Sequence, residues 1–297
     1  MTAKIIDGLA IAREVRVGIA ARAKALAARG VTPALTLIRV GDDPASGVYV
    51  RNKVRACADV GIRSEIVHLP ADVSEEALLD RIRRLNDTPS VHGILVQLPL
   101  PAHIAPRHVL ETISVAKDVD GFHLYNVGGL VIGQTVFPPC TPYGVQKILE
   151  HEGIELEGKN VTVVGASNIV GKPMALMLMQ REATVAICHA KTRDLAQYTI
   201  LADILVVAAG KPNLIVAPMV RSGAVVIDVG INFLPDGRLV GDVDFEGVKE
   251  KASFITPVPG GVGPMTVTML LENTVGAAER SCASNPAVVN YAHPVPV

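Results

Sequence analysis

Residues 161–175 read VTVVGASNIVGKPMA, which is an apolar run, a glycine turn and a second apolar run in that order. The first run predicts a buried strand and the second predicts a helix that begins directly after the turn. In this layout the N-terminus of a helix faces the pyrophosphate of a dinucleotide. The turn lacks the middle glycine of the usual G-x-G-x-x-G pattern, because Ser167 stands between Gly165 and Gly171. An ordinary strand–helix turn without a ligand is therefore the alternative interpretation.

Apolar runs and helical patterns alternate along the rest of the chain. One helix is expected from Asp7, which can cap its first turn, to about Gly30, and another from Pro264 to Glu279. The apolar runs predict strands at 34–41, 65–69, 91–98, 160–165, 184–189, 203–209 and 224–230. Strands that alternate with helices are typical of parallel sheets covered on both faces. The predicted fold class is α/β, with two domains of parallel-rich sheets covered by helices, the second being Rossmann-like and dinucleotide-binding.

Two segments depart from this alternation. Residues 115–144 are rich in Gly and Pro and carry Asp118 and Asp120 just before Gly121. We interpret them as a functional loop and as the boundary between the two domains. Residues 231–244 read INFLPDGRLVGDVD and predict a hairpin that turns at 236–237, where Asp and Gly follow each other.

The composition limits the classes of protein to which the chain can belong. Its 297 residues suggest about two domains, and 49% of them are hydrophobic while 19% are charged. Lys plus Arg number 28 and Asp plus Glu number 29, so the chain lacks the positive charge that binding nucleic acid or anionic lipid requires. No CxxC pair, apolar run of ~18 residues or secretory signal is found. We expect a cytoplasmic protein with reduced thiols, without a nucleic-acid or membrane partner, and without a metal site.

The end of the second strand in the second half distinguishes between dinucleotides. A site for NAD places Asp or Glu about 20 residues after the glycine turn, on the ribose 2′-OH. This chain instead has His189 and Ala190 there, followed by Lys191 and Arg193. The two cations favour the 2′-phosphate of NADP, and solvated loop charges are the alternative interpretation.

In the first half, a lysine is the candidate for proton transfer. Tyr49 and Lys53 are four residues apart on a predicted helix and therefore share one face. On this spacing alone, a surface lysine beside a half-buried tyrosine is the favoured interpretation. Gln97 ends a predicted strand, where ligands of open α/β sheets bind, so it could contact a ligand or orient the lysine. Of Asp118 and Asp120, one can cap or turn the chain and the other can contact substrate.

These residues lie in motifs that resemble the bifunctional methylenetetrahydrofolate dehydrogenase/methenyltetrahydrofolate cyclohydrolase family. The motifs occur in the family's order and together extend over nearly the whole chain up to about residue 285. They are YVRNK (49–53), GILVQLPLP (93–101), KDVDG (117–121), PCTPYG (139–144), VGASNIVGKP (164–173) and PVPGGVGPMT (257–266).

The resemblance implies two activities and a two-domain organisation with a cleft between the domains. Family members oxidise 5,10-methylenetetrahydrofolate to the methenyl form with NADP and hydrolyse that to 10-formyltetrahydrofolate. This chemistry belongs to one-carbon metabolism and purine biosynthesis. The implied domains are 1–120 plus 268–285 for folate chemistry and 121–267 for NADP, with 286–297 as a tail. A homodimer is also implied.

The resemblance further assigns roles to individual residues. Lys53 is the implied catalytic lysine, which Gln97 tunes, while Asp120 holds the pterin and Tyr49 stacks on it. The residues implied to line the folate site are Pro259, Gly260 and Gly263. Those implied to contact the dinucleotide are Gly165, Ala166, Ser167, Ala190, Lys191 and Ile231.

One departure from the family pattern leaves the choice of dinucleotide open. Family members often carry Arg after the first glycine of the turn, or Ser or Arg after the His that ends the second strand. This chain has Ala166 and Ala190 there. NADP held by Lys191 or Arg193 is expected, with NAD as the alternative.

Two other functions are compatible with parts of the pattern. One is another NADP-dependent two-domain dehydrogenase, of the shikimate or amino-acid type, which would not need segments 93–101 and 257–266 together. The other is a dinucleotide-binding sensor without turnover, which the presence of Lys53 disfavours.

Overall fold

The computed structural model describes residues 2–282, apart from the side chains of residues 44–46 and 48. The described chain forms two compact units. Among the described residues, the three-stranded unit comprises Glu14–Cys140 and residues 267–282, and the six-stranded unit comprises residues 2–13 and Thr141–Thr266. Compared with the predicted domains, residues 2–13, residues 121–140 and Val267 fall in the other unit. The predicted tail, 286–297, lies outside the described residues.

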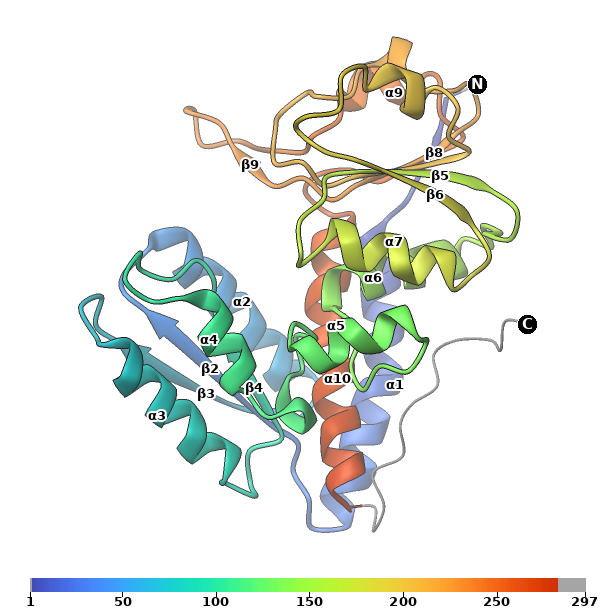
Figure 1. The fold of residues 1–297 in the computed structure, drawn as a ribbon. Helices are drawn as coiled ribbons and strands as arrows, with labels where there is room; N and C mark the ends of the chain where they lie inside the picture. The colour runs from blue at the N-terminus through green and yellow to red at the C-terminus, as the bar shows by residue number, and fades with distance from the viewer. Residues whose placement is uncertain (1, 283–297) are drawn as a thin grey trace. The chain divides into compact units, whose positions relative to one another are not determined.

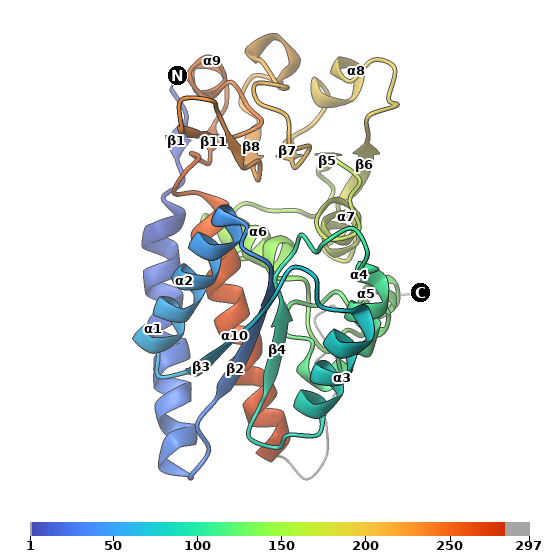
Figure 2. The same cartoon turned by 90° about the vertical axis from the view of Figure 1, so that its left-hand side faces the viewer.

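The three-stranded unit contains a parallel sheet in which β2 (Ala34–Val40) lies between β3 (Arg63–Leu69) and β4 (Gly93–Val96). Helices α3 (Glu75–Asn86) and α4 (Pro106–Thr112) pack their apolar side chains on one face of this sheet. The other face is covered by α2 (Pro44–Asp59) and by the parts of α1 (Gly8–Ala28) and α10 (Val262–Cys282) that belong to this unit (Figures 1 and 2). All three strands end at the same edge, so residues that follow them can meet there.

Helix α10 joins this unit although more than a hundred residues separate it from the remainder in sequence. The guanidinium of Arg22 on α1 donates to both carboxylate oxygens of Glu279, at 2.9 and 2.7 Å, and also pairs with Glu272. The side-chain amide of Asn273 is buried and donates to the backbone oxygens of Val119 and Pro138 at 2.9 and 3.1 Å. The bidentate Arg–carboxylate pair thus fixes α10 against α1, and the satisfied buried amide fixes it against the loop that carries Asp118 and Asp120.

The six-stranded unit contains a parallel sheet in the order β1–β11–β8–β7–β5–β6. Its strands are β1 (Lys4–Ile5), β5 (Asn160–Val164), β6 (Thr184–Cys188), β7 (Ile204–Val207), β8 (Val225–Asp228) and β11 (Phe254–Ile255). Its further helices are α6 (Cys140–His151), α7 (Gly171–Met179), α8 (Ala196–Thr199), η2 (Ala217–Met219) and α9 (Phe245–Lys249). The central strands β7 and β8 are wholly buried, as expected where both faces of a parallel sheet are covered.

The predicted strands, the two long helices and the hairpin are confirmed. The Asp7 carboxylate accepts from the Ala10 backbone N–H at 2.9 Å and so caps α1. The hairpin pairs β9 (Asn232–Phe233) with β10 (Leu239–Val240), and Gly237 adopts φ +83° in its turn. The α/β fold class with two parallel sheets is therefore confirmed.

The interpretation of residues 115–144 as a loop is wrong in part. The segment contains η1 (Val115–Lys117), the helix α5 (Leu124–Val131) and the first turn of α6. One of the glycines that suggested a loop, Gly129, is needed inside α5, because a Cβ there would lie 2.3 Å from the backbone oxygen of Gln134. Tertiary contact, which the sequence alone does not show, overrides the low helix propensity of glycine here.

Among residues 2–282, no helix combines the length and the apolar content that crossing a bilayer requires.

Candidate active site

Lys53 and Gln97 meet at the carboxyl edge of the three-stranded sheet. Lys53 lies on α2 and is half-buried, and Gln97 directly follows β4. The Lys53 Nζ donates to the Gln97 Oε1 at 3.1 Å. The Gln97 Nε2 donates to the backbone oxygen of Leu98 at 2.7 Å, so the amide presents its oxygen to the amine. The structure thus places an uncharged acceptor next to the lysine, as the position of Gln97 at a strand end predicted.

Tyr49 lies one helical turn before Lys53 and is half-buried. Partial burial raises the pKa of its phenol above the ordinary value. The ring is therefore neutral throughout the physiological pH range, which suits contact with a flat, uncharged ring system. A half-buried tyrosine fits the surface pair that the spacing alone suggested as well as it fits a site, so the role of Tyr49 stays a prediction.

The two aspartates of the KDVDG motif have separate roles. Asp118 is buried, and its carboxylate accepts from the His123 backbone N–H and from the Asn126 side-chain amide, both at 2.8 Å. Burial nevertheless raises the pKa of Asp118. Because both bonds go to the segment that opens α5, Asp118 is the residue that shapes the turn. Asp120 is left as the aspartate that can contact substrate.

Asp120 lies close to Lys53 and to Cys140. Desolvation raises the pKa of the Asp120 carboxyl, and the positive charge of Lys53 opposes that rise. The Cys140 thiol forms a hydrogen bond with the Asp120 carboxylate, and its Sγ lies 3.3 Å from the backbone oxygen of Val119. Burial and the neighbouring carboxylate raise the pKa of Cys140 well above that of a free thiol. Cys140 is therefore a neutral thiol beside Asp120, and its Sγ donates to the Val119 oxygen.

The sequence interpretation did not assign Cys140 a role. It is 20 positions from Asp120, and no spacing rule joins the two. The contact depends on Gly121, which adopts φ +78° and whose Cβ would lie 2.7 Å from the Pro139 nitrogen. It depends also on Asn273, whose amide holds Val119 and Pro138 together. The cysteine inside the PCTPYG motif was the available signal.

The glycine turn of the six-stranded unit has the predicted strand–turn–helix geometry. Gly165 directly follows β5 and has φ +119°, and a Cβ there would lie 2.1 Å from the backbone oxygen of Ala208. A Cβ on Gly171, the first residue of α7, would lie 1.9 Å from the Gly165 oxygen. The Ser167 hydroxyl accepts from the Val170 N–H at 3.1 Å. Ser167 therefore closes the turn by a side-chain hydrogen bond where the usual motif has its middle glycine.

The other residues predicted to contact the dinucleotide follow β6 and β8 at the same edge. Ala190, Lys191 and Arg193 are exposed just after β6, where the Lys191 N–H donates to the His189 Nδ1 at 3.1 Å. Ile231 is 46% exposed after β8. A glycine turn that allows close backbone approach and two exposed cations beside the neighbouring strand fit a dinucleotide with a 2′-phosphate.

The predicted site residues thus fall into two groups. Tyr49, Lys53, Gln97 and Asp120 belong to the three-stranded unit. The dinucleotide-contacting residues belong to the six-stranded unit, and so do the predicted folate-lining residues Pro259, Gly260 and Gly263. Gly260 adopts φ +104°, and its backbone oxygen accepts from the Leu9 N–H at 3.1 Å.

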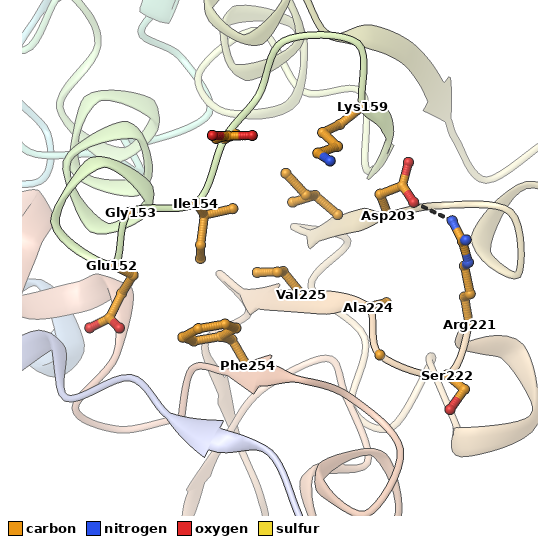
Figure 3. A pocket seen from close by; sticks show the side chains of 13 residues that line it. Glu152, Gly153, Ile154, Lys159, Asp203, Arg221, Ser222, Ala224, Val225 and Phe254 are labelled. Atoms are coloured by element: carbon orange, nitrogen blue, oxygen red, sulfur yellow. Dashed lines mark hydrogen bonds and ion pairs between the residues drawn. The ribbon is translucent and has the colours of Figure 1, made fainter. Parts of the chain in front are cut away.

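A pocket of about 400 Å³ in the six-stranded unit lies at the opposite edge of the sheet (Figure 3). It is lined by Ile204, Val225 and Phe254, the first residues of β7, β8 and β11. The Asp203–Arg221 ion pair borders it. Ligands of open α/β sheets bind at the carboxyl ends of the strands, so this pocket is not the predicted dinucleotide site. Within residues 2–282, no cluster of three or more His, Cys, Asp or Glu side chains could hold a metal ion.

Comparison with known proteins connects the two groups of residues to one family. The family model described as "Tetrahydrofolate dehydrogenase/cyclohydrolase, catalytic domain" matches residues 6–120. Its companion, the "NAD(P)-binding domain" of the same family, matches residues 139–282. This chain belongs to the tetrahydrofolate dehydrogenase/cyclohydrolase family.

Individual family members are similar over almost their full length. The bifunctional protein FolD of Nitrosospira multiformis is 60% identical over 283 residues, which are 95% of this chain and 98% of that protein. The crystal structure of the bifunctional enzyme FolD from Campylobacter jejuni is 51% identical, with a TM-score of 0.92, over 94% of this chain and 99% of that one. The Trypanosoma brucei FolD structure, complexed with NADP cofactor and inhibitor, is 41% identical with a TM-score of 0.91, and the match covers 95% of this chain and 99% of that one.

Replacing Gly165 by alanine tests the geometry of the dinucleotide turn. The added Cβ would overlap the Ala208 oxygen, and overpacking of this kind typically costs about 1–3 kcal/mol. We expect Gly165→Ala to weaken NADP binding about tenfold or more in isothermal titration calorimetry and to lower the melting temperature.

Gly18→Ala is the matched control, because a Cβ at this position on α1 meets nothing within 4 Å. It should bind NADP like the parent and gain about 0.5–1 kcal/mol of stability from reduced backbone entropy. Parent-like NADP affinity in Gly165→Ala would contradict the assignment of the turn.

Proposed function

We propose that this chain catalyses both reactions of its family, with Lys53 as the proton-transfer residue. The reactions are the oxidation of 5,10-methylenetetrahydrofolate with NADP and the hydrolysis of the methenyl product to 10-formyltetrahydrofolate. The observation that carries the proposal is the Lys53 amine held at 3.1 Å from the neutral Gln97 amide oxygen, close to the Asp120 carboxylate. These three residues lie within the segment that matches the family's catalytic domain.

Asp120 and Tyr49 are suited to binding the pterin. The pterin ring presents amino and N–H donors, and a carboxylate can accept two such bonds in parallel. Asp120 lies beside the neutral Cys140 thiol. Tyr49 supplies an aromatic face on the same helix as Lys53. We assign the remainder of the folate site to Pro259, Gly260 and Gly263.

In the hydrolytic step, we assign proton transfer to the neutral form of the Lys53 amine. It removes a proton from the water that attacks the methenyl carbon, so that a C–O bond forms. It returns that proton to the ring nitrogen as the C–N bond opens, and the second proton of the water leaves to solvent as the formyl C=O forms. General base and acid catalysis of this kind typically contributes ~10²–10⁴-fold to a rate.

Gln97 suits this role because it is uncharged. Its oxygen accepts one hydrogen bond from the amine and thereby fixes the direction of the nitrogen lone pair. A carboxylate at the same place would attract the ammonium form and oppose the release of its proton. The nearby Asp120 does exert such an attraction, and its hydrogen bond to Cys140 and any bond to bound pterin reduce it.

For the oxidation, NADP supplies the hydride acceptor when it is bound at the Gly165 turn. The chain's contribution is to position the folate and to exclude water. Positioning of two reactants can lower a barrier by about 7–11 kcal/mol. We assign Gly165, Ala166, Ser167 and Ile231 to the dinucleotide, and Lys191 and Arg193 to its 2′-phosphate.

We also propose that the protein acts in the cytoplasm as a homodimer. Four free cysteines among the described residues, three of them buried, suit a reducing compartment. Phe233, which is 60% exposed on the β9–β10 hairpin, offers an apolar contact to a second subunit.

The role of Lys53 is tested by Lys53→Met, which keeps the apolar stem and removes the amine. We expect hydrolysis of methenyltetrahydrofolate, followed by its absorbance, to fall by ~10²–10⁴-fold. The affinity for NADP should be unchanged. Arg55→Met, which removes an exposed cation from the same helix, serves as control and should keep the parent rate. Hydrolysis by Lys53→Met at the parent rate would show that another group transfers the proton.

The choice of dinucleotide is tested by the double variant Lys191→Ala/Arg193→Ala. A charge-assisted hydrogen bond contributes about 1.5–3 kcal/mol, so the dehydrogenase kcat/KM for NADP should fall by roughly 10–100-fold. The kcat/KM for NAD should stay within about twofold of the parent, since no 2′-phosphate contact is lost. Lys159→Ala, at the opposite edge of the same sheet, is the control for net charge. An equal loss with both dinucleotides would argue against a phosphate contact.

A further inference from the structure

The carboxylate of Asp242 is fully buried and accepts four hydrogen bonds. Three come from consecutive backbone N–H groups: those of Ala209 and Gly210 to Oδ2 at 2.6 and 2.9 Å, and that of Lys211 to Oδ1 at 2.8 Å. The fourth comes from the Asn232 side-chain amide, to Oδ1 at 2.8 Å. A buried charge is costly unless it is fully hydrogen-bonded. The Asp242 carboxylate is hydrogen-bonded in this way, and three of its four donors are backbone N–H groups.

The bonded segment, Ala209–Lys211, directly follows β7 at the carboxyl edge of the six-stranded sheet. Its side chains are exposed, so the loop has little apolar burial of its own to fix it. It continues from Ala208, whose oxygen would lie 2.1 Å from a Cβ on Gly165. Hydrogen bonds that fix residues 209–211 therefore also fix the Ala208 backbone, which packs against the Gly165 turn.

The fourth donor connects the same carboxylate to a second part of the edge. Asn232 begins β9 and immediately follows Ile231, the exposed residue after β8. One buried carboxylate thus joins the loop after β7 to the segment after β8, two neighbouring strands of the sheet.

A second aspartate holds Asp242 in place. The Asp228 carboxylate accepts from the backbone N–H groups of Asp242 and Val243, both at 3.0 Å, and from that of Gly230 at 2.9 Å. The packing leaves no room for side chains between the two carboxylates. A Cβ on Gly230 would lie 2.4 Å from the Asp242 carboxylate, and one on Gly241 would lie 1.9 Å from that of Asp228.

We propose that Asp242 is a positioning residue for dinucleotide binding, which clamps the Ala209–Lys211 loop and the Ile231–Asn232 segment in the conformation that accepts NADP. The proposal rests on the proposed function, because it takes the carboxyl edge of this sheet as the dinucleotide site. It assigns Asp242 no contact with the reacting atoms.

Asp242→Asn tests the clamp with almost no change of shape. Its amide would turn an N–H donor toward backbone N–H donors, so at least one of the three loop bonds is lost. In the protein without nucleotide, the amides of residues 209–211 should exchange with deuterium about tenfold faster or more, while the β7 amides keep their protection. The KM for NADP should rise by a similar factor. Hydrolysis of methenyltetrahydrofolate, which consumes no nucleotide, should remain within about twofold of the parent, because the catalytic group is in the other unit.

Two further variants separate positioning from general destabilisation. Asn232→Ala removes one of the four donors and leaves the loop bonds intact, so the KM for NADP should rise less than in Asp242→Asn. Asp244→Asn is the matched control: it weakens the cap of α9, where the carboxylate accepts from the Gly247 N–H at 3.4 Å, and contacts neither loop. Its KM for NADP and its loop exchange should equal those of the parent.

Each outcome decides a separate question. Parent-like loop exchange and parent-like KM in Asp242→Asn would overturn the clamp while leaving the proposed function intact. If Asp242→Asn does not fold, parent-like KM for NADP in Asn232→Ala would overturn it in the same way. A parent protein that neither binds NADP nor reduces it with methylenetetrahydrofolate would refute the proposed function itself.

Discussion

The hydrogen bond between the Lys53 amine and the Gln97 amide oxygen is the contact on which the proposed catalytic arrangement depends. It requires a helix residue and a residue beyond a strand end to meet, which the parallel β2–β4 pairing and the packing of α2 achieve. It also requires an acceptor without charge, because the amine must be able to lose its proton. The Gln97 Nε2 donates to the Leu98 oxygen, and this bond turns the uncharged Oε1 of the same amide toward the lysine.

In each of the two units, buried polar side chains fix the conformation of glycine-rich loops that have no secondary structure to fix them. Asp118 binds the start of α5, Asn273 joins Val119 to Pro138, and Asp242 gathers the loop after β7. Each of these groups is satisfied by several donors or acceptors, as a buried polar group must be. A loop fixed in this way can expose its outer surface to a ligand and still keep one conformation. The same design therefore serves both the folate chemistry and the dinucleotide edge.

The sequence was sufficient to predict the elements whose pattern is local. Continuous apolar runs identified the buried strands, and Asp7 and the turn at Gly237 marked element ends that the structure contains. The spacing of Tyr49 and Lys53 placed both on one face of α2, although spacing alone favoured a surface pair. The motifs supplied the family, and with it the reaction.

Contacts between residues distant in sequence could not be predicted in this way. Asn273 binds an oxygen 154 positions away, Cys140 meets Asp120, and Asp242 binds a loop 31–33 positions earlier. No periodicity connects such pairs, because tertiary packing alone brings them together. The helix α5 was missed for the same reason: Gly129 indicates a loop, and only the close approach of the Gln134 backbone explains a glycine at that position.

The central claim is that Lys53 works because its partner is neutral, and Gln97→Glu tests this most directly. The substitution keeps the length of the side chain and an oxygen acceptor and adds only a negative charge. The measurement is the rate of methenyltetrahydrofolate hydrolysis at neutral pH, with NADP affinity measured on the same sample. The account predicts a loss of about 10²-fold or more in hydrolysis with unchanged NADP affinity, because the charge keeps the amine protonated. Hydrolysis at the parent rate would contradict it.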